Sequence, residues 1–393
     1  MRFRTTSLLL ALSLALTACA PLPRQPLVEA DAAMWAMIDT QQMPGGALWI
    51  EQLDQGRYHR AYGLRAVKPE AEALDEATIF DAASLTKAVV TAPLVQILRE
   101  QGRLDVDAPL QRYLPDCRGA GYEQITLRLL LTHSSGLPSG LPRLPAWSGA
   151  AGAIERACGQ TLVAAPGTQF RYSDINYILL GEIVARVSGR PLQDFAREAL
   201  FEPLGMADSG YLPLQRFAAA RIAPTQEVDI EAGRGRVLRG EVHDPTARRM
   251  GGVAGHAGLF TTTADLARFA RMLLRQGLTD DGRRLLSAES VALMTTPQQP
   301  AGVEASRGMG WDIDTPFSRP RGTLYPRGTS FGHTGFTGCA FWLDPGSRSF
   351  YVLLANRVHP GHPTNTLPLY QQLGTLAARA AGLGEAEQKP LSR

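Results

Sequence analysis

Hydrophobic and polar positions follow the same order of patterns at both ends of the chain. Each end contains one stretch with helical periodicity, at 28–41 and at 366–381. Each end also contains two apolar, β-rich runs separated by a short turn, namely 47–53 with 57–63 and 338–343 with 349–355. We therefore expect one antiparallel sheet built from both ends of the chain and covered by the two terminal helices.

The middle of the chain is patterned mainly for helices, several of which stop at a glycine. The expected helices span 84–101, 126–132, 174–188, 191–200, 263–276 and 287–294. Residues 138–165 and 223–240 lack this periodicity, and we expect them to form long loops. The pattern predicts an α+β fold, in which an antiparallel sheet flanked by N- and C-terminal helices carries a mostly helical lobe.

One domain at about 28–385 accommodates all of these elements. Its α/β lobe is expected at about 28–83 and 305–385, and its helical lobe at about 84–304. A cleft between two such lobes is a common place for a functional site.

The N-terminus has the features of an export signal. Two arginines precede an apolar stretch that is too short to cross a membrane and ends in Leu16-Thr17-Ala18-Cys19. This tetrapeptide resembles the lipobox of bacterial lipoproteins, whose cysteine is acylated and becomes the new N-terminus. We therefore expect a signal peptide at 1–18, a lipid anchor on Cys19, a tether at 19–27 and a location in the bacterial envelope, at the outer membrane facing the periplasm. A plain secretory signal is the alternative.

The composition excludes some partners and leaves few cysteines to pair. The 40 Lys and Arg nearly balance the 37 Asp and Glu, and no basic run beyond the N-terminus indicates nucleic-acid binding. Of the later cysteines, Cys117 and Cys158 are better placed to form a disulfide than Cys339. No Cys/His cluster indicates a metal site, and the pair His359 and His362 is expected to be solvated. We expect no metal and no other cofactor.

Ser84 and Lys87 carry the first chemical signal. They lie three residues apart at the start of an expected helix, which places both on one face. Free N–H groups and the helix dipole at that end favour a developing negative charge on Ser84. Desolvation near this positive end should lower the pKa of Lys87, as a base requires. Arginine cannot be this base, and the chain is otherwise poor in lysine.

Two weaker motifs follow. Tyr172 stands just before the helix expected at 174–188, where a phenolate is easier to form and can shuttle a proton. Gly332-His333-Thr334-Gly335-Phe336 precedes an expected strand, and its small residues let a substrate backbone approach. The N–H of Phe336 can then serve as an oxyanion donor. Taken alone, the first motif is equally a packing tyrosine and the second a glycine-rich turn.

In the order Ser-x-x-Lys, Tyr-x-Asp and His-Thr-Gly, these motifs resemble the serine β-lactamase and penicillin-binding protein superfamily, in particular its class C β-lactamase-like branch. The likeness runs from about residue 30 to 380. It implies that Ser84 forms an acyl-enzyme, that Lys87 and Tyr172 move its proton, and that the N–H groups of Ser84 and Phe336 hold the oxyanion. His333 replaces the lysine of β-lactamases proper, beside Thr334 and Gly335 on the substrate-binding strand.

Further segments around His243-Asp244, 251–260 and 356–360 resemble periplasmic lipoproteins of DD-carboxypeptidase type and related muramyl-peptide amidases. The implied function is hydrolysis of peptidoglycan stem peptides through an acyl-serine. A β-lactamase and a small-ester hydrolase are alternatives. So is a protein of another class, a lipoprotein that binds penicillin or wall peptides without turnover. Within these segments His243, Asp244 and His256 either line the cleft or have structural roles.

Asp174 departs from the asparagine of the superfamily. An ionised aspartate accepts hydrogen bonds but cannot donate one. If Asp174 faces the site, it should pair with Lys87 and favour the charged lysine, which moves the base role toward Tyr172. If it points away, it should cap the helix that it opens. The sequence leaves both possibilities open.

Overall fold

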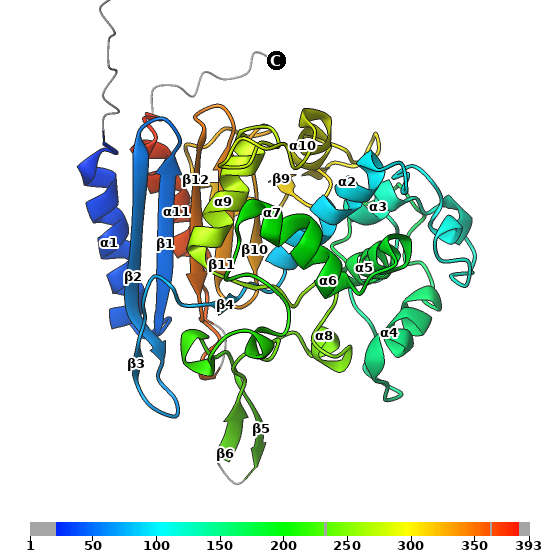
Figure 1. Cartoon of the computed structure of the whole chain (residues 1–393), viewed down its shortest axis with the longest axis horizontal. Coiled ribbons are helices and arrows are strands. Elements are labelled where there is room, and N and C mark those ends of the chain that lie inside the picture. Colours follow the sequence, from blue (N-terminus) through cyan, green and yellow to red (C-terminus); the bar gives the residue numbers. More distant parts are fainter. Residues whose placement is uncertain (1–20, 232–233, 362–363, 385–393) are drawn as a thin grey trace, which may run out of the picture.

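The computed structural model describes residues 21–231, 234–361 and 364–384. An antiparallel sheet of eight strands forms its centre, in the order β3-β2-β1-β12-β11-β10-β9-β8 (Figure 1). The strands are β1 Gly45–Gln52, β2 Gly56–Ala66, β3 Glu72–Ala73, β8 Ser306–Arg307, β9 Asp312–Asp314, β10 Phe331–Gly335, β11 Cys339–Asp344 and β12 Ser349–Ala355. Strands from the two ends of the chain meet directly, with Leu48 of β1 opposite Leu353 of β12. The expected sheet is confirmed.

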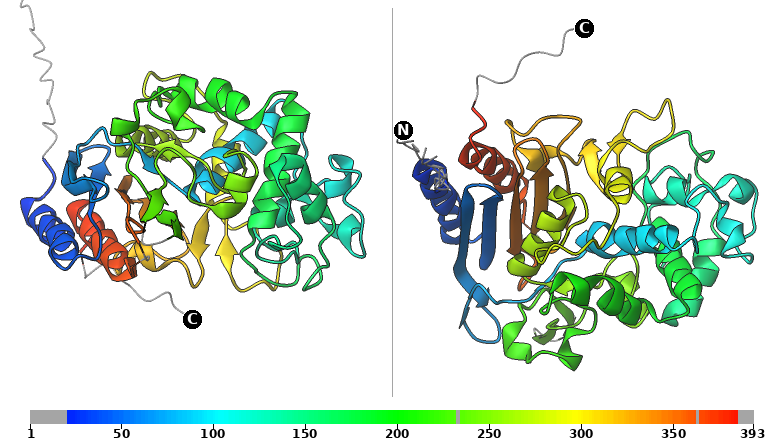
Figure 2. Two further views of the ribbon diagram at one scale, coloured as in Figure 1. Left: turned by 90° about the horizontal axis from the view of Figure 1, so that it is seen from below. Right: turned by 45° about the horizontal axis from the view of Figure 1, so that its top comes forward.

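The two terminal helices lie side by side on one face of this sheet (Figure 2). They are α1, Arg24–Asp39, and α11, Leu367–Ala380. Met34 and Leu373 lie in one apolar cluster with Leu353 of the sheet, so each helix buries its apolar stripe there. Helix α1 begins at Arg24, inside the stretch 19–27 that the sequence predicts as a tether.

Helix α9, Thr263–Leu274, packs against β1 and β12 on the face of the sheet opposite to α1 and α11. Its buried residues Leu266, Phe269 and Leu273 belong to the same apolar cluster as the sheet residues Trp49 and Val352. The assignment of all of 84–304 to a helical lobe is therefore wrong for this segment. The amphipathic stripe of α9 matches the sheet as well as it would match another helix, so periodicity alone could not decide between them.

The helical lobe lies beyond β10 and β9. Its remaining helices are α2 Ala92–Glu100, α3 Leu127–Leu131, α4 Gly149–Cys158, α5 Asp174–Ser188, α6 Leu192–Ala196, α7 Glu202–Leu204, α8 Pro245–Arg249 and α10 Ala288–Thr295. Residues 87–91 form a π-helical turn in front of α2, a feature often found at functional sites. None of the described helices combines the length and the apolar character that a membrane crossing requires.

Two segments expected as loops contain regular structure. Helix α4 lies within 138–165, and the hairpin of β5 (Glu227–Glu231) and β6 (Arg234–Val237) lies within 223–240. Two glycines weaken the helical pattern of α4, and the hairpin is too polar to show the alternation of a half-buried strand. The C-terminal residue of α4, Cys158, forms a disulfide with Cys117, the pair that the sequence favours.

Candidate active site

Ser84 follows a tight turn after the short strand β4, Phe80–Asp81, which pairs with β7, Phe260–Thr261. The buried carboxylate of Asp81 accepts hydrogen bonds from the backbone N–H groups of Ala83 at 2.8 Å and His243 at 2.7 Å. Ala83 has a φ of +48°, in the left-handed region that alanine rarely adopts. These bonds hold the strained turn that presents Ser84 at the start of its helix.

Lys87 is fully buried and points to three oxygen atoms. Its Nζ lies 3.0 Å from Ser84 Oγ, 3.0 Å from the carbonyl oxygen of His256 and 2.8 Å from Asp174 Oδ1. Desolvation works to lower the pKa of Lys87, but the charges and hydrogen bonds of Asp174 and Tyr172 outweigh it and raise the pKa above its ordinary value. The lowered lysine pKa expected from desolvation alone is therefore wrong, and the structure shows the outcome expected for an Asp174 that faces the site, a charged lysine paired with that carboxylate.

Asp174 is the first residue of α5, yet it does not cap that helix. The N-cap position belongs to Ser173, whose side chain makes no capping bond. The Asp174 carboxylate is one-third exposed and pairs with Lys87 instead. Of the two roles open to this residue, the structure shows the one that faces the site.

Tyr172 stands two residues before Asp174 and lies over the lysine. Its ring centroid is 5.0 Å from Lys87 Nζ and 4.4 Å from the ring of His133. The half-buried phenol lines the same cavity as Ser84. Segments that are far apart in the sequence thus bring Ser84, Lys87 and Tyr172 together.

The His-Thr-Gly motif lies on β10, at the edge of the cavity. His333 is buried, and its Nδ1 donates to the carbonyl oxygen of Thr334 at 2.8 Å. Desolvation, reinforced by the positive charges of Arg307 and Lys87, lowers the pKa of His333 well below its ordinary value. His333 is therefore neutral at physiological pH, unlike the lysine that it replaces.

The next two residues bring β10 close to the nucleophile turn. A Cβ at Gly335 would lie 2.5 Å from the carbonyl oxygen of Ala82, so only glycine allows this approach. Within the described parts of the chain, the backbone N–H groups of Ser84 and Phe336 have no hydrogen-bond acceptor. Two such donors beside Ser84 are suited to a developing oxyanion.

The loop 251–258, which is rich in glycine, also contacts the lysine, through the carbonyl oxygen of His256. His256 is buried, and its Nε2 lies 2.9 Å from Asp244 Oδ1. Asp244 also caps α8 by accepting from the N–H of Ala247 at 2.7 Å. One possible ligand atom from each of Asp174, Asp244 and His256 lies within 4.8 Å of the others, which makes this a possible cation-binding group. Asp174 Oδ1 already pairs with Lys87, and Asp244 Oδ1 already contacts both His256 Nε2 and the N–H of Ala247.

The other histidines have clear contacts. His243 stacks on the exposed Phe336 ring at 5.5 Å, at the cavity edge. His359, expected to be solvated, is buried: its Nε2 accepts from the N–H groups of Val67 and Lys68, and its Nδ1 donates to Thr225. His362 and Cys19 lie outside the described residues.

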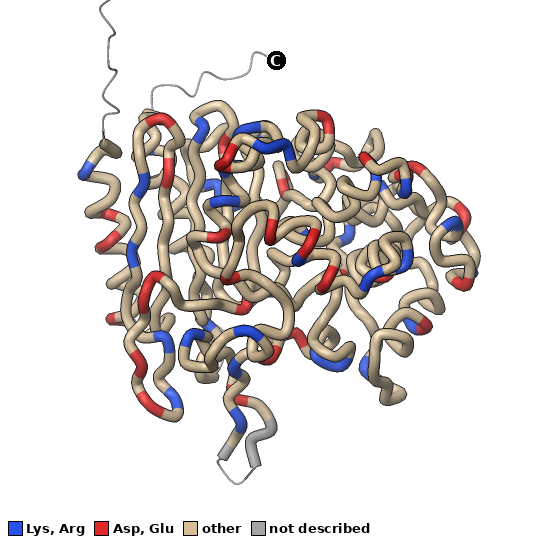
Figure 3. The backbone as a smooth tube through the Cα atoms, viewed as in Figure 1, with Lys and Arg blue, Asp and Glu red and all other residues tan. Residues whose placement is uncertain are grey.

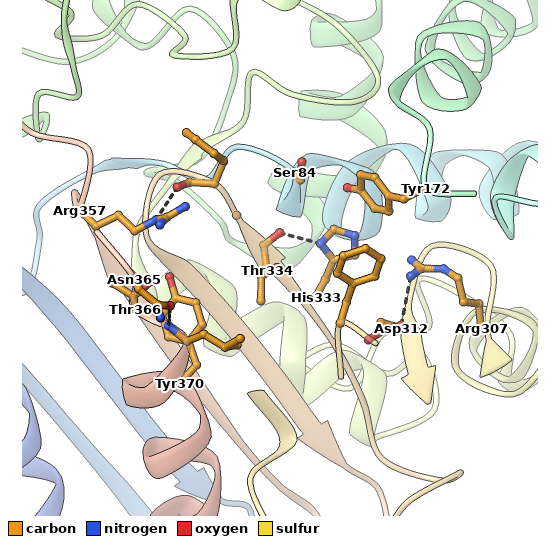
Figure 4. Close-up of a pocket in the computed structure, with 14 residues that line it drawn as sticks. Ser84, Tyr172, Arg307, Asp312, His333, Thr334, Arg357, Asn365, Thr366 and Tyr370 are labelled. Atoms are coloured by element: carbon orange, nitrogen blue, oxygen red, sulfur yellow. Dashed lines mark hydrogen bonds and ion pairs between the residues drawn. The ribbon is translucent and has the colours of Figure 1, made fainter. Parts of the chain in front are cut away.

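Ser84 opens onto a cavity of about 280 Å³ between β10, the start of α11 and the helical lobe (Figure 4). Besides the expected residues, its lining contains several that sequence reasoning did not assign to the site: Arg307, Asp312, Phe317, Arg357, Asn365, Thr366, Leu367 and Tyr370. The sequence holds no local signal for them, because arginine is abundant and the others are common residues in ordinary turns and helices.

A two-lobed fold with a serine and a buried lysine in its cleft defines a class of serine hydrolases that form acyl-enzymes. The chain belongs to the β-lactamase family, whose family model, described as "Beta-lactamase", matches residues 28–375. An Escherichia coli K12 protein described as "Putative D-alanyl-D-alanine carboxypeptidase" is 33% identical over 349 residues, which cover 80% of this chain and 79% of that protein. The resemblance and the fold class that the sequence indicated are confirmed, and the chain is a serine hydrolase.

Solved structures share the fold. A class C β-lactamase matches with a TM-score of 0.70 at 20% identity, covering 94% of this chain and 98% of its own. The octameric penicillin-binding protein homologue from Pyrococcus abyssi matches with a TM-score of 0.68 at 23% identity, covering 88% of this chain and 76% of its own.

Proposed function

We propose that the protein hydrolyses an amide bond in peptidoglycan stem peptides, as a DD-carboxypeptidase does, through an acyl-enzyme on Ser84. The observation that carries this proposal is the 3.0 Å contact between Ser84 Oγ and Lys87 Nζ, within a cavity that Tyr172 also lines. The description of the Escherichia coli relative as a "Putative D-alanyl-D-alanine carboxypeptidase" supports the choice of substrate.

Tyr172 is the first proton acceptor, because Lys87 is held in its charged form. In the proposed step the Tyr172 phenolate, whose ring lies 5.0 Å from Lys87 Nζ, takes the proton of Ser84 Oγ as that oxygen bonds to the substrate carbonyl carbon. The resulting oxyanion receives hydrogen bonds from the N–H groups of Ser84 and Phe336. As the carbon–nitrogen bond breaks, the phenol returns the proton to the leaving amine. Water then attacks the ester and gives a proton to the phenolate. The phenol passes this proton to Ser84 Oγ as the bond between that oxygen and the acyl carbon breaks, which releases the acid and restores the phenolate.

Hydrolysis of β-lactams is the second candidate, and Asp174 argues against its being efficient. The carboxylate faces the site and can only accept hydrogen bonds while ionised, as its contact with Lys87 requires. A penicillin side chain would bring a carbonyl acceptor toward it. We therefore expect penicillins to acylate Ser84 and the resulting acyl-enzyme to be hydrolysed slowly.

We further propose a lipid anchor on Cys19 that holds the enzyme in the bacterial envelope, at the outer membrane facing the periplasm. The lipobox-like tetrapeptide before Cys19 supports this location. Cys19→Ser should remove the lipid and release the protein from the membrane fraction. A correctly cleaved Cys19→Ser protein that still partitions into detergent would overturn the anchor.

Incubation with purified muropeptides, read by mass spectrometry, tests the main proposal. Loss of one alanine residue from pentapeptide stems is the expected result. Ser84→Ala should abolish this product and labelling by a fluorescent penicillin, with a loss of turnover of at least about 10³-fold. Labelling without turnover in the wild type would favour the binding lipoprotein instead. Cleavage between the sugar and the stem peptide would favour an amidase.

A further inference from the structure

Helix α1 carries an apolar stripe on the side that faces away from the sheet. Val28 and Trp35 lie two turns apart on this side, and 47% and 40% of their surfaces are exposed. Ala32 and Ala36 lie on the same side and are exposed as well. The opposite side of the helix buries Met34 against the sheet. Helix α1 therefore has two apolar sides, and the described parts of the chain bury only one of them.

The acidic side chains on either flank of this stripe are paired with arginines. Glu29 accepts a hydrogen bond from Arg379 of α11 at 2.7 Å, and Asp31 accepts one from Arg60 of β2 at 2.8 Å. Unpaired carboxylates would be repelled by anionic lipid headgroups, whereas these two are already neutralised. The stripe ends at Asp39, in the last turn of the helix, so its apolar part lies toward the N-terminal end.

The N-terminal end of α1 is also the end closest to the proposed lipid anchor. Four residues, 20–23, separate Cys19 from Arg24, the first residue of the helix. Because a fully extended chain spans about 3.5 Å per residue, α1 begins within about 18 Å of the lipidated cysteine. The helix lies at the edge of the molecule with its outer side uncovered by other described elements (Figure 1). The lipid surface that holds Cys19 is therefore within reach of the stripe.

The side chains of the stripe suit the interface between lipid and water. Tryptophan is enriched at this interface, because its large ring is apolar and its N–H remains hydrogen-bonded in the headgroup region. The Trp35 ring packs edge-on against Tyr62 with 5.9 Å between centroids, which holds it at the surface of the helix. An apolar helix face binds a membrane in proportion to the area that it buries there. Two large side chains bury too little to replace a lipid, so Cys19→Ser should still release the protein.

We propose that the apolar stripe of α1 lies against the lipid headgroups and fixes the orientation of the enzyme on the membrane. This inference rests on the proposed anchor at Cys19 and extends it from a tether to a defined contact. Helix α1 packs on β2, and the strands β1, β12 and β11 lie between β2 and β10 (Figure 2). The contact therefore leaves the cavity beside β10 open to wall peptides.

Quenching of tryptophan fluorescence by brominated lipid tests the contact on a protein whose attachment is imposed. Residues 19–393 include every described residue, and they can be purified without a lipid and coupled through the Cys19 thiol to a maleimide lipid in vesicles. Cys339 is buried, and Cys117 and Cys158 are joined in a disulfide, so coupling takes place at Cys19. The vesicles contain phosphatidylethanolamine and phosphatidylglycerol with plain or brominated acyl chains.

Bromination should lower the emission of the coupled wild type by the share of Trp35 among the five tryptophans. The difference between the two kinds of vesicle should disappear in Trp35→Phe, and it should decrease in Ala32→Glu, which places a charge on the stripe. Trp147→Phe is the matched control, because it removes a partly buried tryptophan of the helical lobe, and it should keep the difference. Equal emission of the wild type in both kinds of vesicle, or a difference that survives in Trp35→Phe, would overturn the proposal.

Two further measurements separate this inference from the anchor and from self-association. The mass of the protein isolated from the cell envelope reports the lipid on Cys19. A protein without that lipid rejects the anchor, and quenching in the coupled protein then retains the stripe as a lipid-binding surface. Sedimentation of the uncoupled chain identifies the occupant of the stripe. A monomer agrees with a membrane contact, whereas a dimer that Ala32→Glu dissociates would show that a second copy covers the stripe and would reject the proposal.

Discussion

The Lys87 ammonium group lies 2.8 Å from the Asp174 carboxylate, and the lysine is fully buried while the aspartate reaches solvent. This pairing keeps the lysine charged and so assigns the first proton transfer to Tyr172. The nucleophile thus keeps its neighbouring cation while the base is a different residue. The consequences can be tested at each member of the pair.

Asp174→Asn should release Lys87 from its carboxylate. The pKa of the lysine should then fall, because desolvation is no longer opposed by that charge. The pH optimum of ester hydrolysis should shift, and release of bound penicillin should accelerate by at least about tenfold, since asparagine can donate to a β-lactam carbonyl. Asp194→Asn is a control in the first turn of another helix and should leave both properties unchanged. Efficient β-lactam hydrolysis by the wild type would contradict this account.

Lys87→Arg should be nearly as damaging as Lys87→Ala, with a loss of turnover on the order of 10³-fold. The buried position fits a compact ammonium that contacts Ser84, His256 and Asp174 at once, and the larger, planar guanidinium cannot make these three contacts in the same space. Lys68→Arg, at an exposed lysine paired with Glu227, should have no effect. If the Lys87→Arg enzyme keeps more than about a tenth of its turnover, a positive charge at this position is sufficient and the compact ammonium is not required.

The site was predictable where its chemistry is local and not where it depends on distant partners. Ser84 and Lys87 lie on one short segment, so their spacing indicates their contact. The raised pKa of Lys87 depends on Asp174, which is close only after folding. Arg307 belongs to a two-residue edge strand with no periodicity of its own.

The fold and the surface follow the same rule. The apolar runs of both sheet halves indicated their pairing. Helix α9 could not be assigned to a lobe, because an amphipathic stripe does not show whether it packs against a sheet or against another helix. The balanced charge of the sequence is also seen on the folded chain, where basic and acidic positions are interspersed over both lobes (Figure 3).

Asp81 should make the turn before Ser84 sensitive to pH. Burial raises its pKa to about 6, above the value of 3.8 for a free aspartate. Its contribution to stability is therefore complete below about pH 4 and is lost as the pH rises through 6, by up to about 3 kcal/mol. Asp81→Asn lacks this titration, so its unfolding free energy should fall less than that of the wild type between pH 4 and 7. Urea denaturation across this range is the measurement, and parallel curves for the two proteins would show that Asp81 does not titrate there.

His133 should lower the stability of the protein as the pH falls, which is opposite to the effect of Asp81. Its pKa is lowered well below 6.5 by desolvation and by the charges of Arg307 and Lys87, so the unfolded chain binds a proton that the folded chain rejects. Its contribution to stability is complete above about pH 6.5 and is lost as the pH falls toward the lower folded pKa. His133→Asn tolerates the φ of +57° at this position and does not titrate. Between pH 7 and 5, the unfolding free energy of the variant should depend less on pH, by up to about 1.4 kcal/mol per pH unit. The difference between the two urea-denaturation series removes the shared contribution of Asp81. If the two slopes agree over that range, the pKa of His133 does not differ between the folded and the unfolded chain.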